Sequence, residues 1–298
     1  MTTPFALLDG ACLNAAHDLQ SMKLQRGPAL MMLAALAFTV MVSLVKIARQ
    51  ELDVFDVILF RGLVAVPVAL VLARGKLRIE RKGVMLLRSA TGFGAMLCFF
   101  GAAKGLAIAD LQIISRLQPL AVGFLAPLVL GATEKPKRGI WVVLILGLLG
   151  CGIIIGPELA VGSWWGGLAL GAVLFSAVSH TSVRALKEEH SASVVFWFQL
   201  FVTVICGAIW LLTESSLPPV HLIWILVAVG ALASLGQWLM TQAYAADRAA
   251  NVAAASYVSP LFGAAMDWIA FSELPTWQAL VGGSLVIGAG LWLVFRKA

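Results

Sequence analysis

Charged side chains are scarce in this chain. They make up 12% of its 298 residues, against about 25% in soluble globular domains, and hydrophobic residues make up 61%. The mean hydropathy is +0.96. This composition excludes a soluble domain and predicts a polytopic protein of the lipid bilayer. The net charge of +6 is therefore not interpreted as a nucleic-acid footprint, and no nucleic-acid partner is expected.

Residues that build enzyme sites are also few. The four cysteines show no paired or metal-ligand spacing, and of the four histidines only His180 lies plainly inside an apolar run. The chain has no Walker loop, dinucleotide fingerprint, zinc-ligand helix or nucleophile elbow. We therefore expect no enzyme activity, no metal site and no cofactor.

What the chain has instead is a series of apolar runs. They lack the period-two alternation of membrane strands, so they predict an all-α fold with ten transmembrane helices. An apolar helix of ~20 residues crosses a bilayer, and ten would leave only short connections. The expected spans are 28–48, 54–73, 84–103, 108–131, 139–157, 164–186, 192–212, 221–243, 250–271 and 276–295.

Lysine and arginine predict the orientation. Sixteen of the 21 lie at the termini or in and beside the second, fourth, sixth and eighth connections; three lie on the other face, and Arg61 and Arg116 lie within spans. Because basic loops stay on the cytoplasmic side, both termini are expected in the cytoplasm. The first 27 residues lack a basic start followed by an apolar run, so 1–27 is interpreted as a cytoplasmic leader.

The chain repeats itself. A shift of 138 residues lays Glu51 on Glu189, and a shift of 141 lays Ser115 on Ser256 and Pro119 on Pro260. The predicted repeats are 28–157, with helices one to five, and 158–298, with helices six to ten and a short C-terminus. Because five is odd, the second repeat enters the membrane from the opposite side. Many secondary transporters are built from such inverted repeats around one site near the midplane.

Several motifs resemble the ten-helix, EamA-like branch of the drug/metabolite transporter superfamily. They are Phe60-Arg61-Gly62, the Pro-Leu pairs at Pro119 and Pro260, the acids Glu134 and Glu273, and the glycines of helices five and ten. The resemblance implies an inverted 5+5 repeat in a bacterial-type inner membrane, with both termini cytoplasmic. It also implies that helices one, three, four, six, eight and nine surround a central cavity.

The prolines of helices four and nine mark a candidate hinge. Pro119 and Pro260 lack an N–H and free the carbonyls of Ser115 and Ser256. Such kinks either supply hinges and polar ligands at equivalent places in the two repeats, or are structural kinks satisfied by a neighbouring serine or water.

Arg116 lies beside the first kink, at a depth where a charge should face the bundle or a wet cavity. We expect it to bind a carboxylate or phosphate of the substrate; the alternative is a bond to freed carbonyls or to an internal acid. Its repeat mate is Tyr257.

Polar and aromatic residues predict the rest of a substrate site. Helix eight carries a stripe at helical spacing, and helices four and nine extend it. The alternative is contact between helices. The candidates are Gln237, Trp238, Thr241, Gln242, Tyr244, Gln112, Ser115, Gln118, Asn251 and Ser256.

Two residues are candidates for coupling to an ion, with protons as the expected ion. Asp267 lies inside helix nine, and His180 lies in helix six. The alternatives are a solvated acid near the outer end of its helix and a hydrogen-bonded packing residue. Two arginines are assigned no role in binding: Arg61 is expected to pair with Asp56, and Arg88 to reach the cytoplasmic surface.

The sequence thus predicts a secondary transporter of a small amphiphilic metabolite. An amino acid or amino-acid-derived compound is favoured, moved by export. Uptake of a cofactor-like solute such as riboflavin or S-adenosylmethionine is the alternative, and a non-transporting receptor or scaffold ranks lower. A monomer and a homodimer are both compatible with the sequence.

Overall fold

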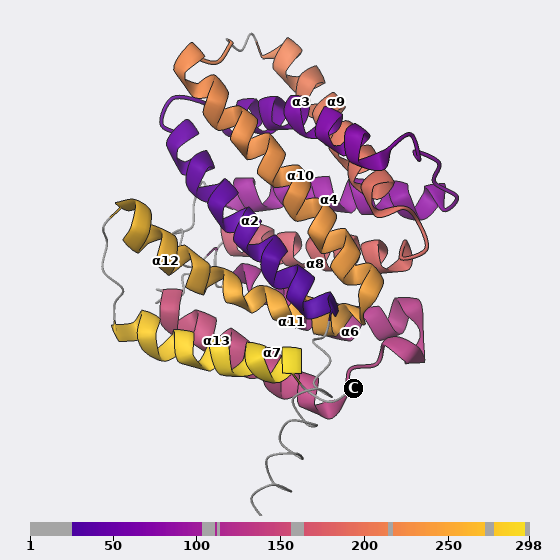
Figure 1. Cartoon of the computed structure of the whole chain (residues 1–298), viewed down its shortest axis with the longest axis vertical. Helices are drawn as coiled ribbons and strands as arrows, with labels where there is room; N and C mark the ends of the chain where they lie inside the picture. The colour runs from indigo at the N-terminus through magenta and orange to yellow at the C-terminus, as the bar shows by residue number, and fades with distance from the viewer. Residues whose placement is uncertain are drawn as a thin grey trace, which may run out of the picture.

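The computed structural model describes residues 26–102, 111, 114–155, 164–213, 217–271 and 277–295. Every regular element in these ranges is helical and none is a strand, which confirms the all-α prediction (Figure 1). The α-helices are α2 (Arg26–Ala48), α3 (Val54–Ala73), α4 (Lys82–Ala102), α6 (Gln118–Leu130), α7 (Arg138–Ile155), α8 (Trp164–Ala185), α9 (Ser191–Leu212), α10 (Ile223–Ala246), α11 (Ala249–Ala255), α12 (Ser259–Phe271) and α13 (Trp277–Phe295). The 3-10 turns are η1 (Ala132–Glu134), η2 (Val220–Leu222) and η3 (Ser256–Val258).

Six of the described helices are long and apolar enough to cross a membrane. They are α2, α3, α4, α8, α9 and the segment from Val220 through α10. Their outward faces are also apolar: Leu128 on α6 is 82% exposed, and Leu212 on α9 is 84% exposed. Side chains of this kind are stable against lipid and costly in water. The chain is therefore a multi-pass membrane protein, and the count of ten spans stays a prediction.

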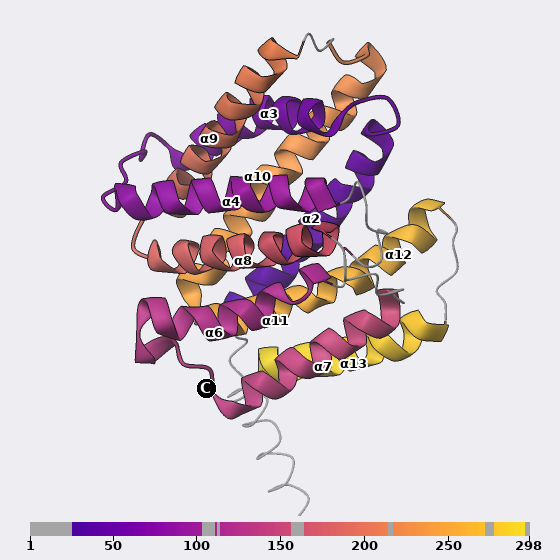
Figure 2. The ribbon, with the colours of Figure 1, turned by 180° about the vertical axis from the view of Figure 1, so that it is seen from behind.

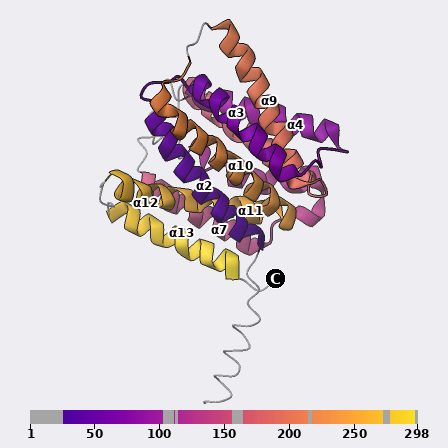
Figure 3. The same ribbon diagram turned by 45° about the horizontal axis from the view of Figure 1, so that its top comes forward.

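Helices from the first half of the chain pack against helices from the second half. The most extensive helix packing joins α2 to α10, α4 to α8, α3 to α9 and α7 to α13, and each pair takes one helix from residues 26–155 and one from 164–295. Figure 3 shows α10 between α2 and α3, and Figure 2 shows α4 and α8 side by side. The repeats predicted from the sequence are therefore not separate bodies.

Helices α7 and α13 run side by side, as Figures 1 and 2 show. Their backbones approach closely, because a Cβ added to Gly150 would lie 2.8 Å from the carbonyl oxygen of Gly282. The glycines of helices five and ten therefore permit close packing, as membrane helices with small residues do.

The fourth and ninth expected spans are each interrupted at the predicted place. A turn at Arg116 and Leu117 precedes α6, which has Pro119 in its first turn. In the ninth span α11 ends, η3 follows, and α12 begins one residue before Pro260. The carbonyl of Ser256 accepts a hydrogen bond from Ser259 Oγ at 2.8 Å, which is the neighbouring-serine alternative.

The even-numbered connections meet at one end of the bundle. In the sixth connection Glu189 Oε1 accepts hydrogen bonds from the backbone N–H groups of Glu80 and Arg81 in the second, each at 3.0 Å. At the other end, Glu51 of the first connection contacts His221 of the seventh, with 2.9 Å between Oε1 and Nε2. The helices between these loops therefore run from one end to the other.

A largely buried ion pair joins the even connections at the end where they meet. Arg184 Nε donates to Glu134 Oε1 at 2.8 Å, and Glu134 Oε2 accepts from the N–H of Ala249, the first residue of α11, at 2.9 Å. Arg184 Nη1 donates to the carbonyls of Tyr244 at 2.8 Å and Ala245 at 3.0 Å. Glu134 was expected to stabilise the start of helix five; its carboxylate instead caps α11, where a negative charge is favourable.

Candidate functional site

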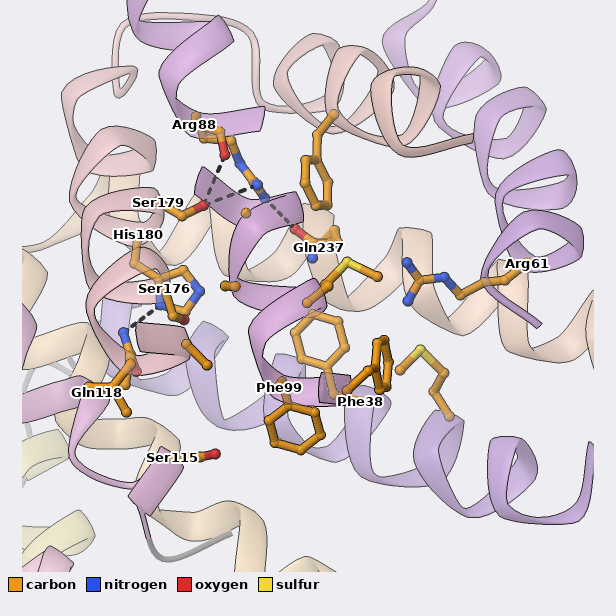
Figure 4. Close-up of a pocket in the computed structure, with 18 residues that line it drawn as sticks. Phe38, Arg61, Arg88, Phe99, Ser115, Gln118, Ser176, Ser179, His180 and Gln237 are labelled. Atoms are coloured by element: carbon orange, nitrogen blue, oxygen red, sulfur yellow. Dashed lines mark hydrogen bonds between the residues drawn. The ribbon is translucent and has the colours of Figure 1, made fainter. Parts of the chain in front are cut away.

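A cavity of about 370 Å³ lies among α2, α3, α4, α8, α9, α10, the first residue of α6 and the segment leading into it (Figure 4). This volume is within the range of small-molecule sites. Eight of its lining residues are polar or charged: Arg61, Arg88, Ser115, Gln118, Ser176, Ser179, His180 and Gln237. The apolar wall consists of alanine, valine, methionine and four phenylalanines, Phe38, Phe99, Phe100 and Phe198.

Arg88 enters the cavity from α4 and is held by three other helices. Its Nη1 donates to Ser179 Oγ of α8 at 3.3 Å, and its Nη2 donates to Gln237 Oε1 of α10 at 2.9 Å. Its Cζ lies 3.6 Å from the ring centre of Phe198 on α9, a cation–π contact. The side chain is 3% exposed. The expectation that Arg88 reaches the cytoplasmic surface is therefore wrong: its partners on three neighbouring helices hold it inside the bundle.

Arg61 enters from α3. Figure 4 shows its guanidinium extending toward the region of Gln237 and Phe38. Its Nε is buried and has no hydrogen-bond partner among the described residues. The expected pair with Asp56 stays a prediction, and the structure places Arg61 on the cavity wall.

The cavity carries positive charge without an acid. Among its described lining residues are two arginines and no aspartate or glutamate. A charge at membrane depth costs about 3 kcal/mol on insertion scales, and more without water. Ser179 and Gln237 donate or accept hydrogen bonds but are neutral, so they leave the charge uncancelled. The site can therefore attract and bind an anion.

A hydrogen-bonded group forms the wall on the α8 side. His180 Nδ1 lies 2.6 Å from Gln118 Nε2 and 3.3 Å from Tyr244 Oη. Because an amide N–H and a phenol O–H both donate, Nδ1 acts as acceptor in this arrangement, which holds the imidazole neutral with its proton on Nε2. Ser176, one turn earlier on α8, faces the same space (Figure 4).

Four predicted site residues lie together on the cavity wall: Ser115, Gln118, His180 and Gln237. The other residues of the stripe predicted on helix eight do not line the cavity. Trp238 packs between α3 and α9, Thr241 Oγ1 donates to the carbonyl of Gln237 at 2.7 Å, and Gln242 is not a lining residue. Tyr244 is fully buried behind His180 and orients it.

The predicted residues of helix nine also lie away from the cavity. Asn251 Nδ2 donates to Asp247 Oδ1 at 2.8 Å, and Ser256 Oγ donates to the carbonyl of Ala253 at 2.7 Å. Tyr257 is 2% exposed, and its carbonyl accepts from Cys151 Sγ at 3.4 Å. The side chains of Asn251 and Ser256 bond within the protein, which agrees with the packing alternative, whereas the buried Oη of Tyr257 has no hydrogen-bond partner among the described residues.

Arg116 does not line the cavity; its electrostatic neighbours are Cys151 and Tyr257, and its Nε has no partner among the described residues. Gln112 and the side chain of Asp267 lie outside the described residues.

The resemblance implied a cavity among helices one, three, four, six, eight and nine. The described lining includes Arg61 of helix two and Phe198 of helix seven, and no residue of helix nine. Sequence reasoning missed both arginines. The rule applied to Arg116, that an arginine within a span faces the bundle, would have found Arg61, and Arg88 lies two turns into α4.

The model of the EamA-like transporter family matches this sequence twice, over residues 25–156 and 163–296. The chain belongs to the EamA-like transporter family. This confirms the resemblance seen in the sequence, and it points to transport of a small molecule and away from catalysis.

The similar proteins include transporters of different solutes. A pseudopaline exporter of Pseudomonas aeruginosa is 29% identical over 281 residues, which cover 92% of this chain and 98% of the relative. A riboflavin transporter of Brucella anthropi is 26% identical over 230 residues, covering 73% and 78%. A crystal structure with 17% identity matches with a TM-score of 0.80 over 93% of this chain and 100% of its own, which shows the shared fold.

Proposed function

We propose that the chain is a secondary transporter that moves a small amphiphilic metabolite across the inner membrane by alternating access. The observation that carries this proposal is the cavity, whose walls come from both predicted repeats and combine cations, amides and aromatic rings. A receptor or scaffold is expected to have a closed or apolar cavity, and the two arginines disfavour it.

The contacts support an inverted 5+5 repeat. Exchange of equivalent helices between repeats converts the α2–α10 pair into the α8–α4 pair, and both are among the most extensive packings. Glu51 and Glu189, which the sequence aligned, contact equivalent connections at opposite ends of the bundle. Near the even connections α2 begins, with Gly27 beside Asp247, and α8 ends. The first helices of the two repeats thus run in opposite directions, as in the inverted repeats of many secondary transporters.

The basic loops support a cytoplasmic location for both termini. Arg81, Lys135 and Arg248 lie at the end where the even connections meet. The backbone N–H of Arg81 donates to Glu189 Oε1 at 3.0 Å, and Arg248 Nη1 donates to the carbonyl of Lys135 at 3.4 Å. Under the positive-inside rule this end faces the cytoplasm.

We favour an amino acid or amino-acid-derived compound as the substrate, moved by export. The support is a carboxylate-binding guanidinium beside aromatic rings, together with the similarity to a pseudopaline exporter over nearly the whole chain. Uptake of a cofactor-like solute is the second candidate, because riboflavin transporters are among the similar proteins.

Two parts of the mechanism are further proposals. The interruptions at Pro119 and Pro260 act as hinges in the two repeats. Protons couple to transport through Asp267 or His180.

The test is flux in proteoliposomes that hold the full chain, with and without a proton gradient. The panel comprises radiolabelled amino acids, N-substituted amino acids and riboflavin. We expect saturable flux of a member of the first two classes, and loss of gradient-driven accumulation in Asp267→Asn or His180→Gln with downhill exchange retained. Saturable flux of riboflavin alone would favour the second candidate, and an absence of flux for every solute in wild-type protein would contradict transport.

A further inference from the structure

The two arginines of the cavity restrict the class of substrate. Arg61 and Arg88 belong to different helices, share one cavity, and have no acid beside them in its described lining. No described residue of the lining offers a compensating negative charge, and salt in solution screens buried charges only weakly. An anionic group that enters the cavity would therefore compensate them.

The two guanidiniums differ in how firmly they are held. Arg88 is fixed in place by Ser179, Gln237 and the Phe198 ring, all of them neutral groups. It thus presents a positioned cation whose charge is not cancelled. The Nε of Arg61 and the Nε of Arg88 are both buried without a hydrogen-bond partner among the described residues, and Arg61 reaches the cavity from the α3 side (Figure 4). A guanidinium has five N–H donors, so both arginines retain donors for a ligand.

The remaining wall fits an apolar body. Phe38 and Phe99 lie beneath the arginines in Figure 4, and Phe100 and two methionines add to the same lining. Ser115, Ser176 and Gln118 offer neutral polar groups on the α8 side. A purely hydrophilic diacid would leave the aromatic rings without a contact, and a hydrophobic cation would face two like charges.

We propose that the substrate is an amphiphilic anion with two carboxylates, one bound by Arg61 and the other by Arg88, with its apolar part against Phe38 and Phe99. This inference rests on the proposed function and narrows its substrate to diacids. A planar guanidinium matches a carboxylate with two parallel hydrogen bonds, which favours carboxylates over chloride.

A matched pair of ligands tests the proposal on wild-type protein. N-benzoylglutamate has two carboxylates and an aromatic ring, and N-benzoylglutamine replaces one carboxylate with a neutral amide of the same size. Binding to the purified full chain in detergent is measured by calorimetry. We expect the diacid to bind at least about tenfold more tightly, as the loss of one hydrogen-bonded charge contact predicts. Equal affinities, or binding of neither compound, would overturn the proposal.

Variants of the two arginines test whether the preference for the diacid over the monoacid arises in the cavity. Arg61→Gln and Arg88→Gln are each expected to reduce the diacid's affinity to about that of the monoacid, a loss of about tenfold. Arg61→Lys keeps the positive charge but lacks the planar guanidinium that donates two parallel hydrogen bonds, so we expect an intermediate affinity. This variant replaces Arg61→Gln in the test if Arg61→Gln does not fold. Arg138→Gln removes an exposed cation at the start of α7 and is the control; an equal loss there would contradict a cavity site.

Flux separates this inference from the proposed function. If the diacid binds with the expected preference but no solute is transported in proteoliposomes, transport is wrong and the anion site stands. If a neutral or cationic solute is transported and the diacid preference is absent, the diacid inference is wrong and transport stands.

Discussion

Arg184, whose side chain is 12% exposed, and Arg88, which is buried, lie on helices that pack against each other, α8 and α4. Arg184 is 2.8 Å from a carboxylate, and its other donors bond to two backbone carbonyls. Arg88 bonds to a hydroxyl and an amide. The first charge is matched inside the protein and holds the ends of α8, α10 and α11 together. The second is positioned just as carefully but left unmatched, and an unmatched, positioned charge beside a cavity is what a ligand site needs.

This contrast predicts opposite effects on stability. Loss of the acid in the matched pair should have the largest effect on stability, because it leaves the Arg184 guanidinium inside the protein without its counter-charge. Glu134→Gln is expected to lower the free energy of unfolding by about 3–5 kcal/mol. The thermal midpoint in detergent, read by size-exclusion chromatography after heating, measures this.

The double variant Glu134→Gln/Arg184→Gln is the control for that pair. With both charges removed, we expect part of the lost stability to return. If Glu134→Gln alone melts like the wild type, the pair does not hold this end together.

For Arg61, the second cavity arginine without an acid in the described lining, the expected sign of the stability change is reversed. Arg61→Gln removes a charge that costs about 3 kcal/mol at membrane depth, so the midpoint should stay equal or rise while binding of the diacid is lost. The same heating series measures it. A fall as large as that of Glu134→Gln would show that Arg61 is matched within the protein after all.

A smaller effect should follow from displacing Arg88 without changing its charge. A Cβ added to Gly92 would lie 2.6 Å from Arg88 Nη1 and 2.9 Å from the Phe198 ring. Gly92→Ala should therefore move the guanidinium and weaken diacid binding by less than the loss of the charge does. Gly83→Ala is the matched control on the same helix, since nothing lies within 4 Å of its added Cβ. Equal affinities in the two variants would mean that the position of Arg88 is unimportant.

The smallest change in diacid binding is expected for Arg116→Gln. The sequence predicted Arg116 as the carboxylate ligand, but it is not among the residues that line the cavity. We expect the preference for N-benzoylglutamate over N-benzoylglutamine to persist in calorimetry. Loss of that preference, with Arg61→Gln behaving like wild type, would return the carboxylate site to Arg116.

The sequence predicted the positions of the helices along the chain better than the contacts between their side chains. The third and seventh apolar runs were placed within two residues of α4 and α9, because lipid demands long apolar helices and loops carry the charge. Prolines located the interruptions before α6 and α12, because a missing N–H breaks the helical ladder at a fixed position.

The faces of the helices could not be predicted in the same way. In apolar helices that are hydrophobic all round, the pattern of side chains does not tell which face meets a neighbour. Arg88 is inside because α8 supplies Ser179 and α10 supplies Gln237 at the same depth, and that depends on how helices distant in sequence pack. Asn251 and Ser256 show the converse, since polar side chains in a predicted site found partners within their own segments.

Alternating access makes one demand that a single measurement can examine. Ser176 lines the cavity, so a thiol at this position reports which side of the membrane the cavity faces. Ser176→Cys in a variant lacking Cys12, Cys98, Cys151 and Cys206 would be labelled with a membrane-impermeant maleimide, added to one side of oriented vesicles or to the other. We expect labelling from both sides, with N-benzoylglutamate protecting against each. Labelling from one side alone, whether or not the diacid is present, would contradict a cavity that opens to both faces of the membrane.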